Sequence, residues 1–170
     1  ESVIAATKQL KKTMIKDLLQ FGFVALNGRG SLLFQSSSIG DIPKEWFVLP
    51  LGQVLSLAYR YPTYYGITYV SQGIPEIRGE LLTEDGEILL DQSKFRYISK
   101  DTATRFPKTK LEENDLVFSI RGTMGKVGLV SKELAGANIT ANLMRLAPDN
   151  RRVTGNFLRL IILSDNFNQR

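Results

Sequence analysis

The sequence contains no histidine and no cysteine among its 170 residues. Without them the chain cannot build a Ser-His-Asp or Cys-His nucleophilic site, a disulfide, or a metal centre of imidazoles and thiolates. The lack of cysteine also agrees with a reducing compartment. These absences exclude the commonest hydrolytic triads and zinc sites.

Signatures of other enzyme classes are missing as well. Gly125-Lys126 superficially resembles the end of a phosphate-binding loop, but Ile120 occupies the place of the first glycine and Val127 that of the Ser or Thr. No carboxylate precedes a lysine by two positions, so the acid-x-Lys half of a common metal-dependent nuclease site is absent. There is also no Pro-Pro dipeptide of the kind that adenine amino-methyltransferases place beside the flipped base. We therefore expect a binding module with no cofactor and no metal of its own.

Long apolar runs are absent too. No stretch approaches the roughly 18 to 20 residues that a membrane-spanning helix needs, and the N-terminus has no signal-peptide pattern. We expect a soluble, cytoplasmic protein that does not contact a membrane. Because the chain starts at Glu1 without an initiator Met and stops within a helical pattern, we also expect a fragment of a longer protein.

The residues that are present describe a basic globular chain. Hydrophobic residues make up 43% and charged residues 23%, which is typical of a folded domain with a real core. Lys and Arg number 22 against 17 Asp and Glu, a formal net charge of +5. This balance favours anionic partners such as nucleic acid, but it does not identify them.

The most informative stretch is a predicted β-hairpin. The apolar runs 116–120 and 126–130 flank a short loop with two glycines, which predicts a tip with positive φ angles. Arg121, Thr123 and Lys126 at this tip are donors suited to phosphates or base edges. The alternative is a purely structural hairpin with solvated cations. Just before it, Glu112, Glu113 and Asp115 are expected on a solvated turn rather than around a metal ion.

The rest of the chain predicts an α+β fold. Apolar residues in a heptad-like pattern predict an amphipathic helix over residues 3–21 that needs a partner helix, with Gly22 as its C-terminal cap. A Gly/Ser-rich linker is expected over 27–41. Beyond it we expect a mixed, hairpin-rich β-sheet, a helix over 100–106 capped by Ser99 and stopped by Pro107, and a last helix over 155–167. The strands are predicted at 46–49, 68–70, 74–78, 95–98, 116–120, 126–130 and 143–146.

Aromatic and basic residues alternate from Tyr59 to Gly66, with Arg60, Tyr64 and Tyr65 among them. Stacking faces and donors of this kind serve both duplex readers and binders of single strands. The alternative is a loop whose tyrosines pack against the sheet. Further along, Arg78 adjoins a glycine that would let the backbone approach a groove.

The order of four segments resembles the target-recognition domain of a type I restriction-modification specificity subunit. The family opens this domain with a Gly-acid-Ile-Pro-x-x-Trp segment and a Leu-Gly-Asp-Val turn. A Gly-Ile-Pro strand, a Gly-Asp-Leu-Leu strand and a Gly-Thr-x-Gly-Lys hairpin follow. Gln53 and Asn114 depart from the family's usual acid and glycine. The matching segments are 39–46, 51–54, 73–79 and 116–126.

This resemblance implies three parts: a spacer helix over 1–26, of which residues 5–14 look like the end, a linker over 27–41, and a target-recognition domain over 42–170. It implies a non-catalytic subunit that recognises half of a split site in double-stranded DNA. Spacer helices would dock methyltransferase subunits, which use S-adenosylmethionine, and a motor-nuclease subunit would use ATP. The expected DNA-binding residues are Arg60, Tyr64, Tyr65, Arg78, Arg121, Thr123 and Lys126. Two other hypotheses stay open: a module that binds RNA or single-stranded nucleic acid, and a non-catalytic protein-interaction domain.

Overall fold

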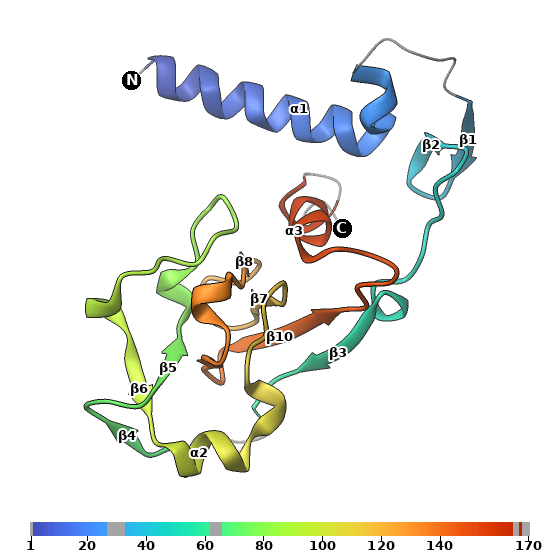
Figure 1. Cartoon of the computed structure of the whole chain (residues 1–170). Coiled ribbons are helices and arrows are strands. Elements are labelled where there is room, and N and C mark those ends of the chain that lie inside the picture. Colours follow the sequence, from blue (N-terminus) through green and yellow to red (C-terminus); the bar gives the residue numbers. More distant parts are fainter. Residues whose placement is uncertain (1, 27–32, 62–65, 165–166, 168–170) are drawn as a thin grey trace. The chain divides into compact units, whose positions relative to one another are not determined.

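A computed structural model describes residues 2–26, 33–61, 66–164 and 167 (Figure 1). The chain divides into two compact units, one made of residues 1–50 and 164–170 and the other of residues 51–163. In the described part of the chain, helices and antiparallel sheets occur together with a parallel strand pair, which confirms the predicted α+β class. Among the described residues, no helix is long and apolar enough to cross a membrane.

The smaller unit contains the long helix α1 (Ser2–Leu26). The predicted cap at Gly22 is wrong, because the helix continues for another turn beyond it. A glycine inside a helix costs only about 1 kcal/mol relative to alanine, so it does not by itself stop one. The predicted apolar stripe is exposed where the structure describes its side chains, with Val3 76%, Leu10 61% and Met14 48% accessible.

The second half of the expected linker is a hairpin rather than a linker. Strand β1 (Phe34–Ser37) pairs antiparallel with β2 (Gly40–Pro43), and Gly40 at the turn has a φ of 103°. The strand predicted at 46–49 is also wrong, since these residues have no regular structure and Phe47 is 83% exposed. An apolar run forms a strand only where a neighbouring strand pairs with it.

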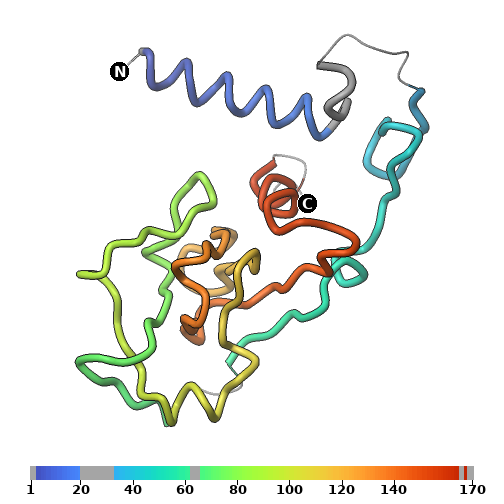
Figure 2. Tube along the Cα trace, in the orientation of Figure 1, coloured from blue at the N-terminus to red at the C-terminus, as the bar shows by residue number. Residues whose placement is uncertain are grey.

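The larger unit holds two four-stranded sheets. The first is antiparallel throughout, in the order β3-β10-β7-β8. Strand β10 therefore lies between β3, from early in the unit, and β7 of the predicted hairpin, and the trace in Figure 2 shows β3 and β10 running side by side. Its members are β3 (Leu55–Tyr59), β7 (Leu116–Ser119), β8 (Val127–Leu129) and β10 (Leu143–Pro148).

The second sheet has the order β4-β6-β5-β9. Strand β6 is antiparallel to both β4 and β5, and β9 joins β5 in parallel. The sequence predicted three of these strands and missed the two-residue β9. The four strands are β4 (Tyr69–Val70), β5 (Ile74–Ile77), β6 (Arg96–Ile98) and β9 (Asn138–Ile139).

Two α-helices complete this unit. Ser99 caps α2 (Lys100–Arg105) by accepting a hydrogen bond from the Thr102 amide, as predicted, and Pro107 starts the 3-10 turn that follows. Helix α3 (Gly155–Leu163) ends earlier than the predicted 167. Short 3-10 turns lie at Leu51–Gln53, Gly79–Leu81, Gln92–Lys94, Pro107–Thr109 and Lys132–Leu134.

The core of the larger unit consists of two apolar clusters. One surrounds Ile77, Leu81 and Leu143, all of them fully buried. The other joins the β7-β8 hairpin to α3 through Val127, Leu158 and other apolar side chains. The hairpin is therefore anchored in the core at its base.

Candidate nucleic-acid interface

The tip of the β7-β8 hairpin is held in one shape by its own backbone. Gly122 and Gly125 have φ angles of 76° and 86°, which confirms the predicted positive values. Ser119 is 1% exposed, and its Oγ donates to the Thr123 carbonyl at 2.6 Å and accepts from the Lys126 amide at 2.9 Å. Backbone hydrogen bonds from Ser119 N to Lys126 O and from Gly125 N to Ser119 O close the loop. The tip is therefore preorganised.

The predicted site residues at this tip differ in how they are placed. Arg121 and Thr123 are exposed, whereas Lys126 is half-buried. The Lys126 Nζ lies 3.4 Å from the carbonyl oxygen of Leu82, to which it donates. The base of the tip is thus tied to the segment that starts at Arg78.

Arg78 lies at the other end of that segment. Its Nη2 donates to the Lys94 carbonyl at 2.7 Å, and its Nη1 pairs with Glu80 at 2.7 Å. Arg78 therefore joins two turns to each other, and its side chain is 28% exposed. Residues 78–82 therefore begin with Arg78 and end with Leu82, whose carbonyl accepts the hydrogen bond from Lys126.

The aromatic loop divides into a buried and an exposed part. Tyr61 is 3% exposed, donates to Asn138 Oδ1 at 2.8 Å, and meets Phe106 edge to face. Burial raises the pKa of Tyr61 to about 12. Arg60 is exposed, while Tyr64 and Tyr65 lie outside the described residues. For Tyr61 the alternative interpretation, in which a tyrosine packs against the sheet, is correct.

One surface feature that the sequence did not single out is a stack of Arg96 on Tyr69. The guanidinium carbon of Arg96 lies 4.2 Å from the ring centre, and both side chains are nearly half exposed. Glu76, which is fully buried, accepts from Arg96 Nε at 2.8 Å and from Nη2 at 2.6 Å through one oxygen. Burial raises the pKa of Glu76, and the hydrogen bond from Arg96 opposes the rise.

A search against protein-family models gave no match. In sequence, the chain is 27% identical over 127 residues to the type I restriction enzyme EcoBI specificity subunit of Escherichia coli, covering 72% of this chain and 26% of that protein. The chain is related to type I restriction specificity subunits. It spans about a quarter of the length of that curated relative.

Two solved structures have a fold similar to that of this chain. One is the HsdS subunit from Thermoanaerobacter tengcongensis, with a TM-score of 0.52 and 17% identity, covering 96% of this chain and 39% of that one. The other comes from work on complex assembly and conformational transition of the type I R-M system. It has a TM-score of 0.54 and 15% identity, and the match covers 95% of this chain and 36% of that one.

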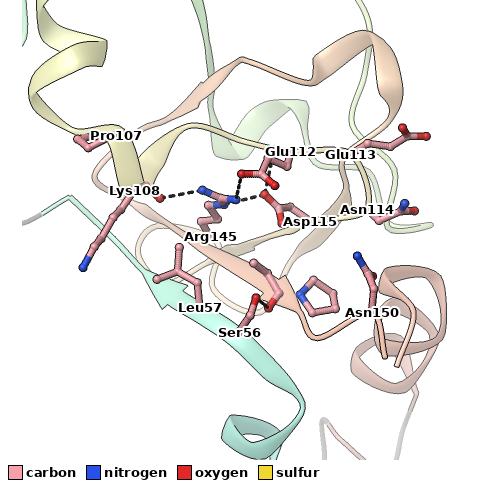
Figure 3. A pocket seen from close by; sticks show the side chains of 12 residues that line it. Ser56, Leu57, Pro107, Lys108, Glu112, Glu113, Asn114, Asp115, Arg145 and Asn150 are labelled. Atoms are coloured by element: carbon pink, nitrogen blue, oxygen red, sulfur yellow. Dashed lines mark hydrogen bonds and ion pairs between the residues drawn. The ribbon is translucent and has the colours of Figure 1, made fainter. Parts of the chain in front are cut away.

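A polar cavity of about 440 Å³ lies beside β3 and β10 and is also lined by the turn before β7 (Figure 3). Arg145 is one of its lining residues and is 5% exposed; it bonds to Asp115 Oδ2 at 2.6 Å, to Glu112 at 3.2 Å and to the Lys108 carbonyl at 3.2 Å. The expectation of a solvated turn is wrong for Asp115, because this carboxylate is the buried partner of Arg145.

In the cavity, Arg145 pairs with both Glu112 and Asp115, and the described residues contain no cluster of three possible metal ligands. Burial raises the pKa of Asp115, while bonds from the Glu112 amide and Arg145 oppose the rise. This arrangement joins the turn before β7 to β10. The outward polar groups of the hairpin tip and of the Tyr69-Arg96 stack make the better candidate for a binding surface.

Proposed function

We propose that this chain is a sequence-specific module for double-stranded DNA, acting as a target-recognition part of a type I restriction-modification specificity subunit. The observation that carries the proposal is the preorganised hairpin tip with Arg121, Thr123 and Lys126, in a chain related to specificity subunits. A two-stranded ribbon fits the major groove of B-form DNA. The chain itself is non-catalytic in this proposal.

The tip offers the two kinds of contact that such recognition uses. Arg121 has the donor geometry for a guanine edge, and its neighbouring glycine allows close approach of the backbone. Lys126, at the base of the hairpin, would neutralise a phosphate and set the orientation on the duplex. Arg60, Arg78 and Arg96 would add positive charge to this surface, and Tyr64 and Tyr65 would add faces on which bases can stack.

The partners follow from the same relation. We infer that the exposed apolar stripe of α1 docks methyltransferase subunits, and that a motor-nuclease subunit joins the complex in the cytoplasm. Adenine methylation and DNA cleavage would then belong to those subunits, with S-adenosylmethionine and ATP as their cofactors. In this assignment residues 1–26 are a spacer helix and the target-recognition domain follows the linker.

Binding measurements on three proteins test the proposal. Wild-type chain, Arg121→Ala and Lys126→Ala are titrated against a duplex selected from a randomised library and against a scrambled duplex, at several salt concentrations. Loss of a base contact costs about 1–3 kcal/mol on the selected duplex and relaxes preference at one position. Loss of a phosphate contact weakens both duplexes alike and lowers the salt slope by about one.

We expect the first pattern for Arg121→Ala and the second for Lys126→Ala. Competition with single-stranded DNA and RNA distinguishes the alternative, since the Tyr69-Arg96 stack is a surface on which an unpaired base could also stack. Preferential binding of single strands would refute the duplex proposal. If neither substitution alters binding, the hairpin tip is only structural.

A further inference from the structure

Met124 stands at the centre of the hairpin tip and is 73% exposed. It is the most accessible large apolar side chain among the described residues of the larger unit. The flanking glycines and the Ser119 hydrogen bonds hold its backbone in place, so this exposure belongs to an ordered loop. An apolar side chain held in water contributes little to folding, so Met124 is available to a partner that approaches the tip.

The charge around Met124 selects the kind of partner. Arg121 precedes it and Lys126 follows it, and the six residues 121–126 contain no acidic group. An apolar protein surface would have to approach two cations, whereas a polyanion is attracted by them. The partner that fits this tip is therefore a nucleic acid with an apolar group at its recognised edge.

A duplex major groove offers one such group, the 5-methyl of thymine, among polar base edges. Met has three rotatable side-chain bonds and a polarisable sulfur, so it adapts to a small apolar contact. We propose that Met124 contacts a thymine methyl group and so contributes specificity for one A·T pair. This inference rests on the proposed duplex-binding function and adds a residue to the same tip.

The test replaces thymine by deoxyuridine, which lacks only the 5-methyl group. A duplex is selected from a randomised library with the wild-type chain, and each thymine is replaced in turn. Covering one methyl-sized apolar group corresponds to about a fourfold change in affinity. We expect one replacement to weaken wild-type binding about fourfold, and Met124→Ala to weaken binding of the original duplex while becoming insensitive to that replacement.

Two further variants make the result specific. Met124→Leu keeps an apolar side chain and should retain part of the sensitivity to deoxyuridine. Leu90→Ala removes an exposed apolar side chain elsewhere in the same unit, 52% accessible, and should leave affinity and deoxyuridine sensitivity unchanged. Thermal unfolding of Met124→Ala should match the wild type, because the position is exposed.

The inference is overturned if no replacement weakens wild-type binding, or if Met124→Ala keeps the sensitivity. If Arg121→Ala still relaxes sequence preference in either case, the proposed DNA recognition stands and only the role of Met124 fails. If the wild-type chain selects no duplex, both fail together.

Discussion

Glu76 shows how a single buried carboxylate can support an exposed binding feature. It lies opposite Arg96 in the β5-β6 ladder, and both Arg96 hydrogen bonds converge on one of its oxygens. Because the hydrogen bonds to Glu76 fix the Arg96 guanidinium, it stays on the Tyr69 ring. Binding of a partner there then costs little further side-chain entropy. A lysine in place of Arg96 would keep the charge and lose the stack.

Because the pKa of Glu76 is raised, the free energy of unfolding of this unit depends on pH. The folded state holds the Glu76 proton more tightly than the unfolded chain, whose pKa is near the ordinary value of 4.5. The free energy of unfolding therefore falls as pH rises from about 4.5 through the raised folded pKa. We expect Glu76→Gln, which stays neutral, to flatten this slope in urea unfolding measured between about pH 4.5 and 7.

Glu113→Gln removes one exposed carboxylate and controls for the change in net charge. Asp115, whose pKa burial also raises, contributes to the slope in both proteins and cancels in the comparison. Equal slopes for wild type and Glu76→Gln would contradict the assignment to Glu76.

At the level of the element, the hairpin depends on Ser119. Replacing it by alanine leaves the Thr123 carbonyl and the Lys126 amide without their side-chain partner. Each intramolecular hydrogen bond contributes about 0.5–1.5 kcal/mol net, so losing the two Ser119 bonds should lower the free energy of unfolding by about 1–3 kcal/mol. Urea denaturation measures the loss, and hydrogen exchange at the Lys126 amide should become faster.

Ser56→Ala is the matched control, because Ser56 is exposed on β3 and its single bond to the Ala147 carbonyl can be replaced by water. If the two alanine variants lose the same stability, the Ser119 bonds do not organise the tip. The DNA affinity of Ser119→Ala should also fall, since a loosened tip must be ordered again on binding.

The elements that sequence predicted carry their own local signals. Two glycines between apolar runs sufficed for the hairpin, and Ser99 with Pro107 sufficed for α2. Strand β9 carries no such signal, because two residues become a strand only through parallel pairing with β5. The β1-β2 hairpin was missed since its residues are mostly polar and exposed, without an alternating pattern.

The candidate site follows the same division. Arg121 and Thr123 could be found from the glycine spacing alone. The Tyr69-Arg96 stack could not, because it needs the registers of three strands that are up to 27 residues apart in sequence. The only sequence signal was a glutamate within the apolar strand Ile74–Ile77, whose burial requires a cationic partner.

At the scale of the whole molecule, we expect α1 to bind the partner subunits and the larger unit to bind DNA, each independently of the other. The double substitution Leu10→Gln, Met14→Gln makes the exposed stripe of α1 polar. We expect capture of methyltransferase subunits to be lost in a pull-down, while duplex affinity stays within twofold of wild type. Lys16→Gln, on the same helix outside the stripe, should retain capture. Full capture by the double variant would contradict docking through this stripe.

The position of β10 in the sequence also determines when β3 can pair during synthesis of the chain. Ser56 on β3 bonds to a carbonyl 91 residues later in the chain, and β10 is the partner that β3 has in its sheet. At about 5–20 residues per second, β3 leaves the ribosome roughly 5 to 18 seconds before that partner exists. During this interval Leu55 and Leu57 have no sheet to join, so nascent chains that stall before Leu143 should be substrates for chaperones or proteases.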